Sequence, residues 1–155
     1  MNADDMKADV VETAPGDGAA AEWKRREMKG IPASLGALWT RRDKDGWRYA
    51  VQLDNSHANA QGVIHGGVLM SFMDHALSLM LWEASGRAMC STIHLDSHFL
   101  SAVVPPAFVE LDGQILRQGR TLAFARGMLR VAGTDVMEAT GVWSIAPARQ
   151  SPANP

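Results

Sequence analysis

This chain of 155 residues has one cysteine, no run of basic residues longer than three, and no uninterrupted apolar stretch of membrane-spanning length. A lone Cys90 cannot form an internal disulfide. The basic run at residues 24–26 is too short for a nucleic-acid footprint. The first residues lack a basic region followed by an apolar core, so we expect no signal peptide. These absences favour a cytoplasmic enzyme or binding protein with neither a nucleic-acid nor a membrane partner.

The length and the charge distribution predict one domain with two tails. Residues 1–20 carry five acidic residues against one lysine, a charge of −4, so the remaining residues sum to +2 and the whole chain to −2. Residues 1–18 are acidic, rich in Ala and Gly, and aperiodic, which predicts a disordered tail. The single domain is expected over residues 19–147, with a loose tail over residues 148–155.

The most informative stretch is a glycine-containing turn, residues 59–67, followed by the apolar run 68–82. The run predicts a buried helix, because it has no broad polar face. At about 15 residues it is shorter than the ~20 that span a bilayer. Asp74 interrupts it, and a carboxylate in an apolar segment is costly unless it is paired or reaches a water-lined cleft. We therefore place a functional site in this stretch.

The remaining pattern predicts an α+β protein. A short helix capped by Asp17 is expected over 19–28, ending at Gly30, and a loop over 54–62. Strands are expected at 35–42 and 47–53 around the turn Asp43–Gly46, at 89–100, and, after a break at Pro105-Pro106, as a meander at 108–116, 122–131 and 136–146. In the strand 89–100, alternation places Ile93, Leu95 and Phe99 on one face and Thr92, His94, Asp96 and His98 on the other.

We expect a curved antiparallel sheet wrapped around one long central helix. A helix that is apolar on all sides needs cover on all sides, and the sheet supplies only part of it. A partner subunit is the simplest cover for the rest. The chain is therefore expected to be a homodimer at least, with a homotetramer favoured.

The motif residues resemble those of the PaaI-type (phenylacetic-acid-degradation type) acyl-CoA thioesterases of the 4-hydroxybenzoyl-CoA thioesterase superfamily. In that family an Asn or Gln precedes a His-Gly-Gly triplet by about six positions, and an acid follows the His by nine. Here Asn59 stands six before His65, and Asp74 nine after it. The resemblance extends over roughly residues 35–145, includes Thr92 and the hairpin 117–125, and implies the hotdog fold. The acidic tail has no counterpart in it.

The glycines and Asp74 supply the expected chemistry. Gly66 and Gly67 lie at a helix N-terminus, where unpaired N–H groups can polarise a thioester carbonyl as an oxyanion hole. Asp74 is the candidate nucleophile or general base, with both roles open. Eight residues of helix separate Gly66 from Asp74, about 12 Å. We therefore predict that the N–H group comes from one subunit and the carboxylate from the other, an arrangement that the resemblance also implies.

Three neighbouring residues are candidates for positioning. His65 and Asn59 are expected to position the thioester or the water, although each could equally serve only the structure of the loop. Thr92 is expected to orient Asp74 or its water, or else to be an ordinary strand threonine. A hydroxyl from Thr92 or Ser78 would favour the ionised carboxylate.

Two pairs of basic residues are possible ligand-binding groups, and only the first pair remains a candidate. Arg117 and Arg120 flank a turn glycine and could grip the phosphates of coenzyme A, or simply face solvent on a hairpin. His94 and His98 are four apart, but on a strand that spacing separates them by about 13 Å, so no metal site is expected.

The sequence thus predicts an acyl-CoA thioesterase that hydrolyses an apolar acyl-CoA, medium-chain or aryl, without metal or cofactor. Two alternatives stay open. One is a non-catalytic acyl-CoA-binding module, which would have no need of Asp74. The other is a hotdog dehydratase or hydratase acting on acyl thioesters, which uses a His and an acid in a different local pattern.

Overall fold

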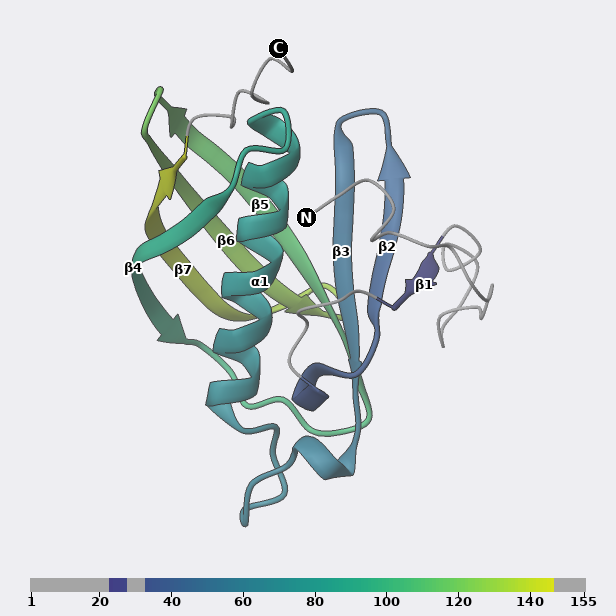
Figure 1. The fold of residues 1–155 in the computed structure, drawn as a ribbon. Helices are drawn as coiled ribbons and strands as arrows, with labels where there is room; N and C mark the ends of the chain where they lie inside the picture. The colour runs from purple at the N-terminus through teal and green to yellow at the C-terminus, as the bar shows by residue number, and fades with distance from the viewer. Residues whose placement is uncertain (1–22, 28–32, 147–155) are drawn as a thin grey trace.

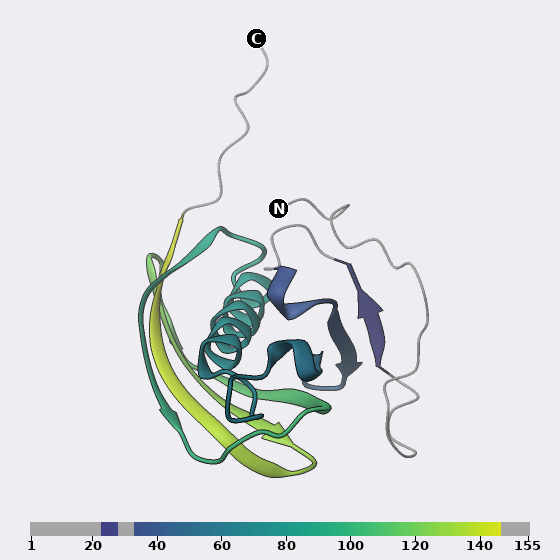
Figure 2. The same ribbon diagram turned by 90° about the horizontal axis from the view of Figure 1, so that it is seen from below.

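The computed structural model describes residues 23–27 and 33–146. Within them, one long helix lies against a seven-stranded antiparallel sheet that curves around it (Figures 1 and 2). The helix is α1 (Gly66–Ala84), and single turns of 3-10 helix lie at Ala33–Leu35 and Asn55–His57. The strands are β1 (Lys24–Arg26), β2 (Leu38–Asp43), β3 (Gly46–Leu53), β4 (Cys90–Phe99), β5 (Ala107–Gln118), β6 (Leu122–Val131) and β7 (Thr134–Ile145).

The strand order is β1-β2-β3-β5-β6-β7-β4. The predicted hairpin is confirmed, because β2 and β3 join across a turn whose ends, Asp43 and Gly46, are paired. The predicted meander is confirmed as β5, β6 and β7. After α1 the chain crosses to the far side of the sheet, where β4 pairs with β7. Among the described strands nothing pairs with the other edge of β4.

The core lies between α1 and the concave face of the sheet. Phe72, Met73 and Leu77 of α1 are fully buried there together with Trp143 of β7. The indole N–H of Trp143 donates to Ser78 Oγ at 2.9 Å, which ties β7 to α1. Burial of apolar area on this scale is the main source of stability in a domain of this size. The other side of α1 is only partly covered: Asp74 and His75 are half-buried.

The N-terminal helix predicted over 19–28 is wrong in its described part. Lys24–Arg26 form β1, which pairs with β2. Trp23 packs edge-on against Phe108, with ring centroids 5.4 Å apart. Arg26 is buried and donates from Nε to Thr40 Oγ1 at 3.3 Å. Pairing and burial outweigh local helical propensity here. The Asp17 cap, residues 19–22 and 28, and the predicted end at Gly30 lie outside the described residues.

Two strand predictions are also corrected. The strand expected from Leu35 begins at Leu38, because residues 33–35 form a helical turn. In β4 the register shifts between Thr92 and His94, so Ile93 is an extra, bulged residue. Such a residue breaks the two-residue alternation of side chains. Thr92 therefore lies on the same face as Leu95, not on the opposite one.

The predicted tails, residues 1–18 and 148–155, lie outside the described residues. In the ranges 23–27 and 33–146 the structure has no helix with the length and apolar character that crossing a bilayer requires.

Candidate active site

The loop before α1 is organised by Asn59. Its side-chain Oδ1 accepts hydrogen bonds from the N–H of Gln61 (2.9 Å) and of Val63 (3.4 Å), and its own N–H donates to the Val63 carbonyl (2.8 Å). Such a side chain, bonded to the backbone two residues on, is typical of a turn-forming Asn. Asn59 therefore fixes the loop that delivers His65 to the helix, which is the structural one of its two predicted roles.

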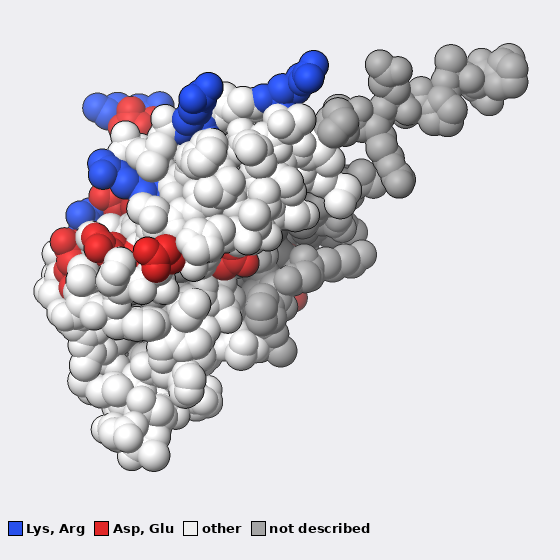
Figure 3. Space-filling view, turned by 90° about the vertical axis from the view of Figure 1, so that its left-hand side faces the viewer, with Lys and Arg blue, Asp and Glu red and all other residues white. Residues whose placement is uncertain are grey.

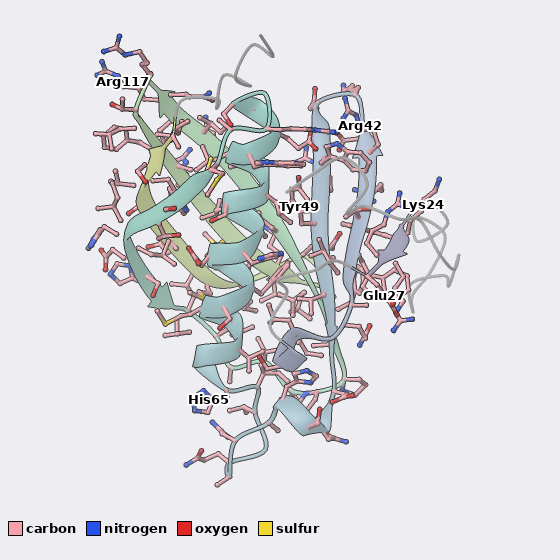
Figure 4. All side chains as sticks on the ribbon, in the orientation of Figure 1. Lys24, Glu27, Arg42, Tyr49, His65 and Arg117 are labelled. Carbon is pink, nitrogen blue, oxygen red and sulfur yellow. The ribbon has the colours of Figure 1, made fainter. Side chains whose placement is uncertain are left out.

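His65 caps the N-terminus of α1. Its Nδ1 accepts the N–H of Gly67 at 3.0 Å, and its side chain is exposed at the lower end of α1 (Figure 4). In the neutral ring the proton consequently lies on Nε2, which is left to face solvent or a ligand. The cap uses the Gly67 N–H, so this group is no longer available as an oxyanion donor.

Gly66 retains the open donor. Nothing in the described part of the chain accepts its N–H, as is usual for the first residues of a helix. A Cβ on Gly66 would lie 3.0 Å from Phe99 Cζ, so the ring of Phe99 occupies the space where a side chain would project. Glycine allows this close approach, and a side chain here would require the half-exposed Phe99 ring to shift.

Asp74 and Thr92 are brought together. The Thr92 hydroxyl donates to Asp74 Oδ1 at 2.6 Å, joining β4 to the middle of α1. The bulge at Ile93 makes this contact possible, because it turns Thr92 toward the helix. Ser78, the other expected hydroxyl partner, instead accepts the indole N–H of Trp143. The next residue on the helix is His75. Its buried Nε2 has no partner within residues 23–27 and 33–146, and burial lowers the pKa of His75.

Other predicted site residues lie apart from this pair within one chain. Arg117 and Arg120 are exposed at the β5–β6 turn. Arg117 lies at the end of the molecule opposite to His65 (Figure 4). Figure 3, which views the side bearing β4, shows Lys and Arg gathered toward the top and a row of acidic groups below them. In one chain, therefore, the arginines and Gly66 cannot contact the same small group.

An apolar recess adjoins Gly66. It has a volume of about 290 Å³, and its lining includes Leu69 of α1, Phe99 at the end of β4, and Leu100 and Val103 beyond it. The segment after β4 is not among the predicted site residues. The only available signal was its apolar character just before Pro105. Across the described ranges, no three His, Cys, Asp or Glu side chains gather closely enough to hold a metal ion.

A family model described as Thioesterase superfamily matches residues 61–138, half of the chain. The chain belongs to the thioesterase superfamily. It is accordingly a thioester hydrolase, and the matched span contains His65, Gly66, Asp74 and Thr92. No curated protein matches this superfamily member in sequence.

Several solved structures share the fold of this thioesterase-superfamily chain. Zebra fish thioesterase superfamily member 2 has a TM-score of 0.68 at 20% identity, covering 77% of this chain and 89% of its own. A phenylacetic acid degradation-related protein from Ralstonia eutropha JMP134 has a TM-score of 0.66 at 24% identity, covering 76% and 91%. A hypothetical thioesterase protein with coenzyme A from Streptococcus pneumoniae TIGR4 has 0.61 at 23%, covering 67% and 83%. The predicted hotdog fold is confirmed.

Proposed function

We propose that this thioester hydrolase cleaves an apolar acyl-CoA, medium-chain or aryl, into the free acid and coenzyme A. The observation that carries the proposal is the half-buried carboxylate of Asp74, held by the Thr92 hydroxyl at 2.6 Å in the middle of an otherwise apolar helix. A carboxylate that is partly removed from water on a mostly apolar helix, with one hydroxyl as its partner, is costly to keep, which argues for a chemical role.

Asp74 acts on the thioester carbonyl in one of two ways. As a nucleophile it adds to the carbonyl carbon, the C–S bond breaks, and the resulting anhydride is hydrolysed by water. As a general base it takes a proton from water while the water oxygen adds. In both, the negative charge that develops on the carbonyl oxygen is accepted by the Gly66 N–H, and the coenzyme A thiolate leaves and takes up a proton.

The complete site needs two subunits. The Gly66 N–H and the Asp74 carboxylate lie about 12 Å apart along one helix, which is too far for both to contact a single carbonyl. The edge of β4 that pairs with no described strand supports the arrangement, because an unpaired strand edge is a template for a second copy. Antiparallel pairing of two β4 strands turns one subunit end for end relative to the other. The His65 end of one subunit then approaches Asp74 and the Arg117 end of its partner. A homotetramer would assemble from two such dimers.

Each end of the substrate has a matching surface. The exposed guanidinium groups of Arg117 and Arg120 suit the coenzyme A phosphates, and the S. pneumoniae neighbour was solved with coenzyme A. The recess of about 290 Å³ beside Gly66 suits an apolar acyl group. We expect His65 to contact the thioester or the attacking water through the N–H on Nε2.

The test is thiol release from short-chain, medium-chain, long-chain and aryl acyl-CoAs. We expect turnover of medium-chain or aryl substrates, a loss of about 10²- to 10⁴-fold in kcat for Asp74→Asn, and a smaller loss for Thr92→Val. Asp45→Asn, which changes an exposed carboxylate in the β2–β3 turn away from β4, is the matched control and should keep the wild-type rate.

Other outcomes would select the alternatives. Binding of acyl-CoA without thiol release by the wild type would identify an acyl-CoA-binding module. Hydration of an enoyl-CoA without thiol release would identify a hydratase. Full activity in Asp74→Asn would remove the carboxylate from the mechanism.

A further inference from the structure

A second cleft lies at the other end of α1. Strands β3 and β5 pair only from Tyr49 opposite Leu111 to Leu53 opposite Ala107, and beyond Tyr49 they separate (Figure 1). The sheet therefore opens between β3 and β5, and the C-terminal end of α1 lines this opening. The resulting cleft has a volume of about 510 Å³ and is lined by the β2–β3 hairpin, by Met80 and Glu83 of α1, and by Gly113 of β5. This volume is within the range of small-molecule sites.

Two polar groups in this cleft have no partner among the residues that the structure describes. Tyr49, only 5% exposed, lies in the space between β3 and α1 (Figure 4), and no residue in the described part of the chain hydrogen-bonds its hydroxyl. The indole N–H of Trp47, on the same strand, is likewise unpaired among the described residues. Neither the Tyr49 hydroxyl oxygen nor the Trp47 indole nitrogen is among the fully enclosed side-chain atoms that lack a partner in the described residues, so both atoms are accessible, and both residues line the cleft. A phenol and an indole N–H left open in one cleft are therefore donors available to a ligand.

Some charged side chains of the cleft form ion pairs with described residues, and others do not. The Arg48 guanidinium is bonded to Asp43 at 2.8 Å, and Glu83 lies 3.5 Å from Arg87. Asp45 is exposed at the tip of the hairpin turn. Arg42 has no acidic partner in the described residues, and its guanidinium carbon lies 5.3 Å above the Trp47 ring. It is the cation best placed to receive an anionic ligand.

The apolar walls favour a flat ligand. Trp47 and the thioether of Met80 both line the cleft, and sulfur and aromatic faces pack favourably against an aromatic ring. Gly113 leaves the floor open for Met80, because a Cβ there would lie 2.9 Å from the Met80 sulfur. Burial, together with the charge of Glu83, raises the pKa of Tyr49, so its hydroxyl stays protonated and can donate.

We propose that this cleft binds a small aromatic carboxylate, whose ring lies between Trp47 and Met80 and whose carboxylate accepts hydrogen bonds from Arg42 and the Tyr49 hydroxyl. The site is separate from the one proposed for hydrolysis. The β2–β3 hairpin stands on the opposite side of α1 from β4 (Figure 1), so the cleft stays open when β4 pairs with a second copy. The proposal does not depend on the chemistry assigned to Asp74.

The experiment is calorimetric titration of the full chain with phenylacetate, with uncharged phenylacetamide as the matched ligand. We expect phenylacetate to bind, and Arg42→Gln to weaken its affinity about ten- to hundred-fold, because a charge-assisted hydrogen bond is lost. Tyr49→Phe should weaken it less. Arg41→Gln is the matched control: Arg41 also lies over an indole, at 4.8 Å from the Trp23 ring, but outside this cleft.

The location of binding is read from the indole N–H resonances of uniformly ¹⁵N-labelled protein. The signal of Trp47, assigned by its absence in Trp47→Phe, should shift on addition of phenylacetate, and that of Trp143 should not. Thiol release by Arg42→Gln should equal that of wild type. The proposal is overturned if phenylacetate does not bind, if phenylacetamide binds equally well, if Arg42→Gln binds as tightly as Arg41→Gln, or if Trp143 shifts in place of Trp47.

Discussion

Asp74 has one carboxylate oxygen occupied and one open. Thr92 donates to Oδ1 at 2.6 Å, and no group in the described part of the chain donates to Oδ2. A hydroxyl orients a carboxylate without adding a positive charge beside it, whereas an arginine would add one. The open oxygen is therefore oriented and accessible, and either proposed mechanism requires both properties. His65 is similar in that Nδ1 is used by the helix cap and Nε2 is left open.

His75 predicts a pH dependence of stability. Burial lowers its pKa in the folded chain below the ordinary 6.5, with Asp74 partly opposing the shift. Between the folded and unfolded pKa values the unfolded chain binds the extra proton, so stability falls as the pH drops below about 6.5 and is unaffected by His75 above it. His75→Leu should therefore lose less stability than wild type between pH 7.5 and pH 5.5. Urea unfolding at the two pH values measures the difference.

His94→Gln is the control for this comparison. His94 is exposed on β4, so this variant removes one histidine of the same chain without opening the core. If His75→Leu loses as much stability as His94→Gln over the same interval, then His75 takes up a proton as readily in the folded chain as in the unfolded one.

At the scale of elements, local patterns predicted most of the sheet. The turn Asp43–Gly46 and the three strands of the meander have their signals within a few residues, and α1 has its own in one continuous apolar run. β1 could not be predicted this way, because it exists through pairing with β2 and burial of Trp23. The bulge at Ile93 also has no local signal. It arises where β4 must match β7, and it decides which face Thr92 occupies.

Gly141 tests how closely β4 and β7 are packed. A Cβ at this position would lie 2.7 Å from the backbone oxygen of His94 and 2.7 Å from the Trp143 ring. Neither can move freely, because the first belongs to the sheet and the second is fully buried and bonded to Ser78. Gly141→Ala should therefore lower the free energy of unfolding by about 1–3 kcal/mol, measured by urea denaturation.

The control is Gly119→Ala at the β5–β6 turn. A Cβ there meets nothing closer than the Leu122 oxygen at 3.4 Å, an ordinary contact, so its stability should stay within about 0.5 kcal/mol of wild type. If the two variants had the same free energy of unfolding, β4 and β7 could move apart at Gly141 without a loss of stability.

At the scale of the whole molecule, the parts of the candidate site that are close together in the sequence were predictable. Asn59, His65, Gly66 and Asp74 lie within one continuous segment, so their spacing alone indicated a turn, a helix start and a carboxylate further along the helix. The recess beside Gly66 and the cleft beside Tyr49 were not predictable, because each is formed by segments far apart in the chain. Their linings depend on the curvature of the sheet, which no single stretch of sequence encodes.

A site shared between subunits predicts complementation of two inactive variants. Asp74→Asn removes the carboxylate, and Gly66→Val places a branched side chain where the Phe99 ring lies, 3.0 Å from a Cβ. Each variant alone should be nearly inactive. In a heterodimer, one of the two sites combines the intact Gly66 of one chain with the intact Asp74 of the other. An equal mixture of the two chains should therefore recover about a quarter of the wild-type thiol release.

The heterodimer is isolated with two different affinity tags, and each variant is first shown to fold and to associate as wild type does. Purified heterodimer should then have about half of the wild-type activity, because one of its two sites is intact. If instead both groups of a site came from one chain, every site in the heterodimer would carry one defect. An inactive but correctly assembled heterodimer would therefore place Gly66 and Asp74 of each site in the same subunit.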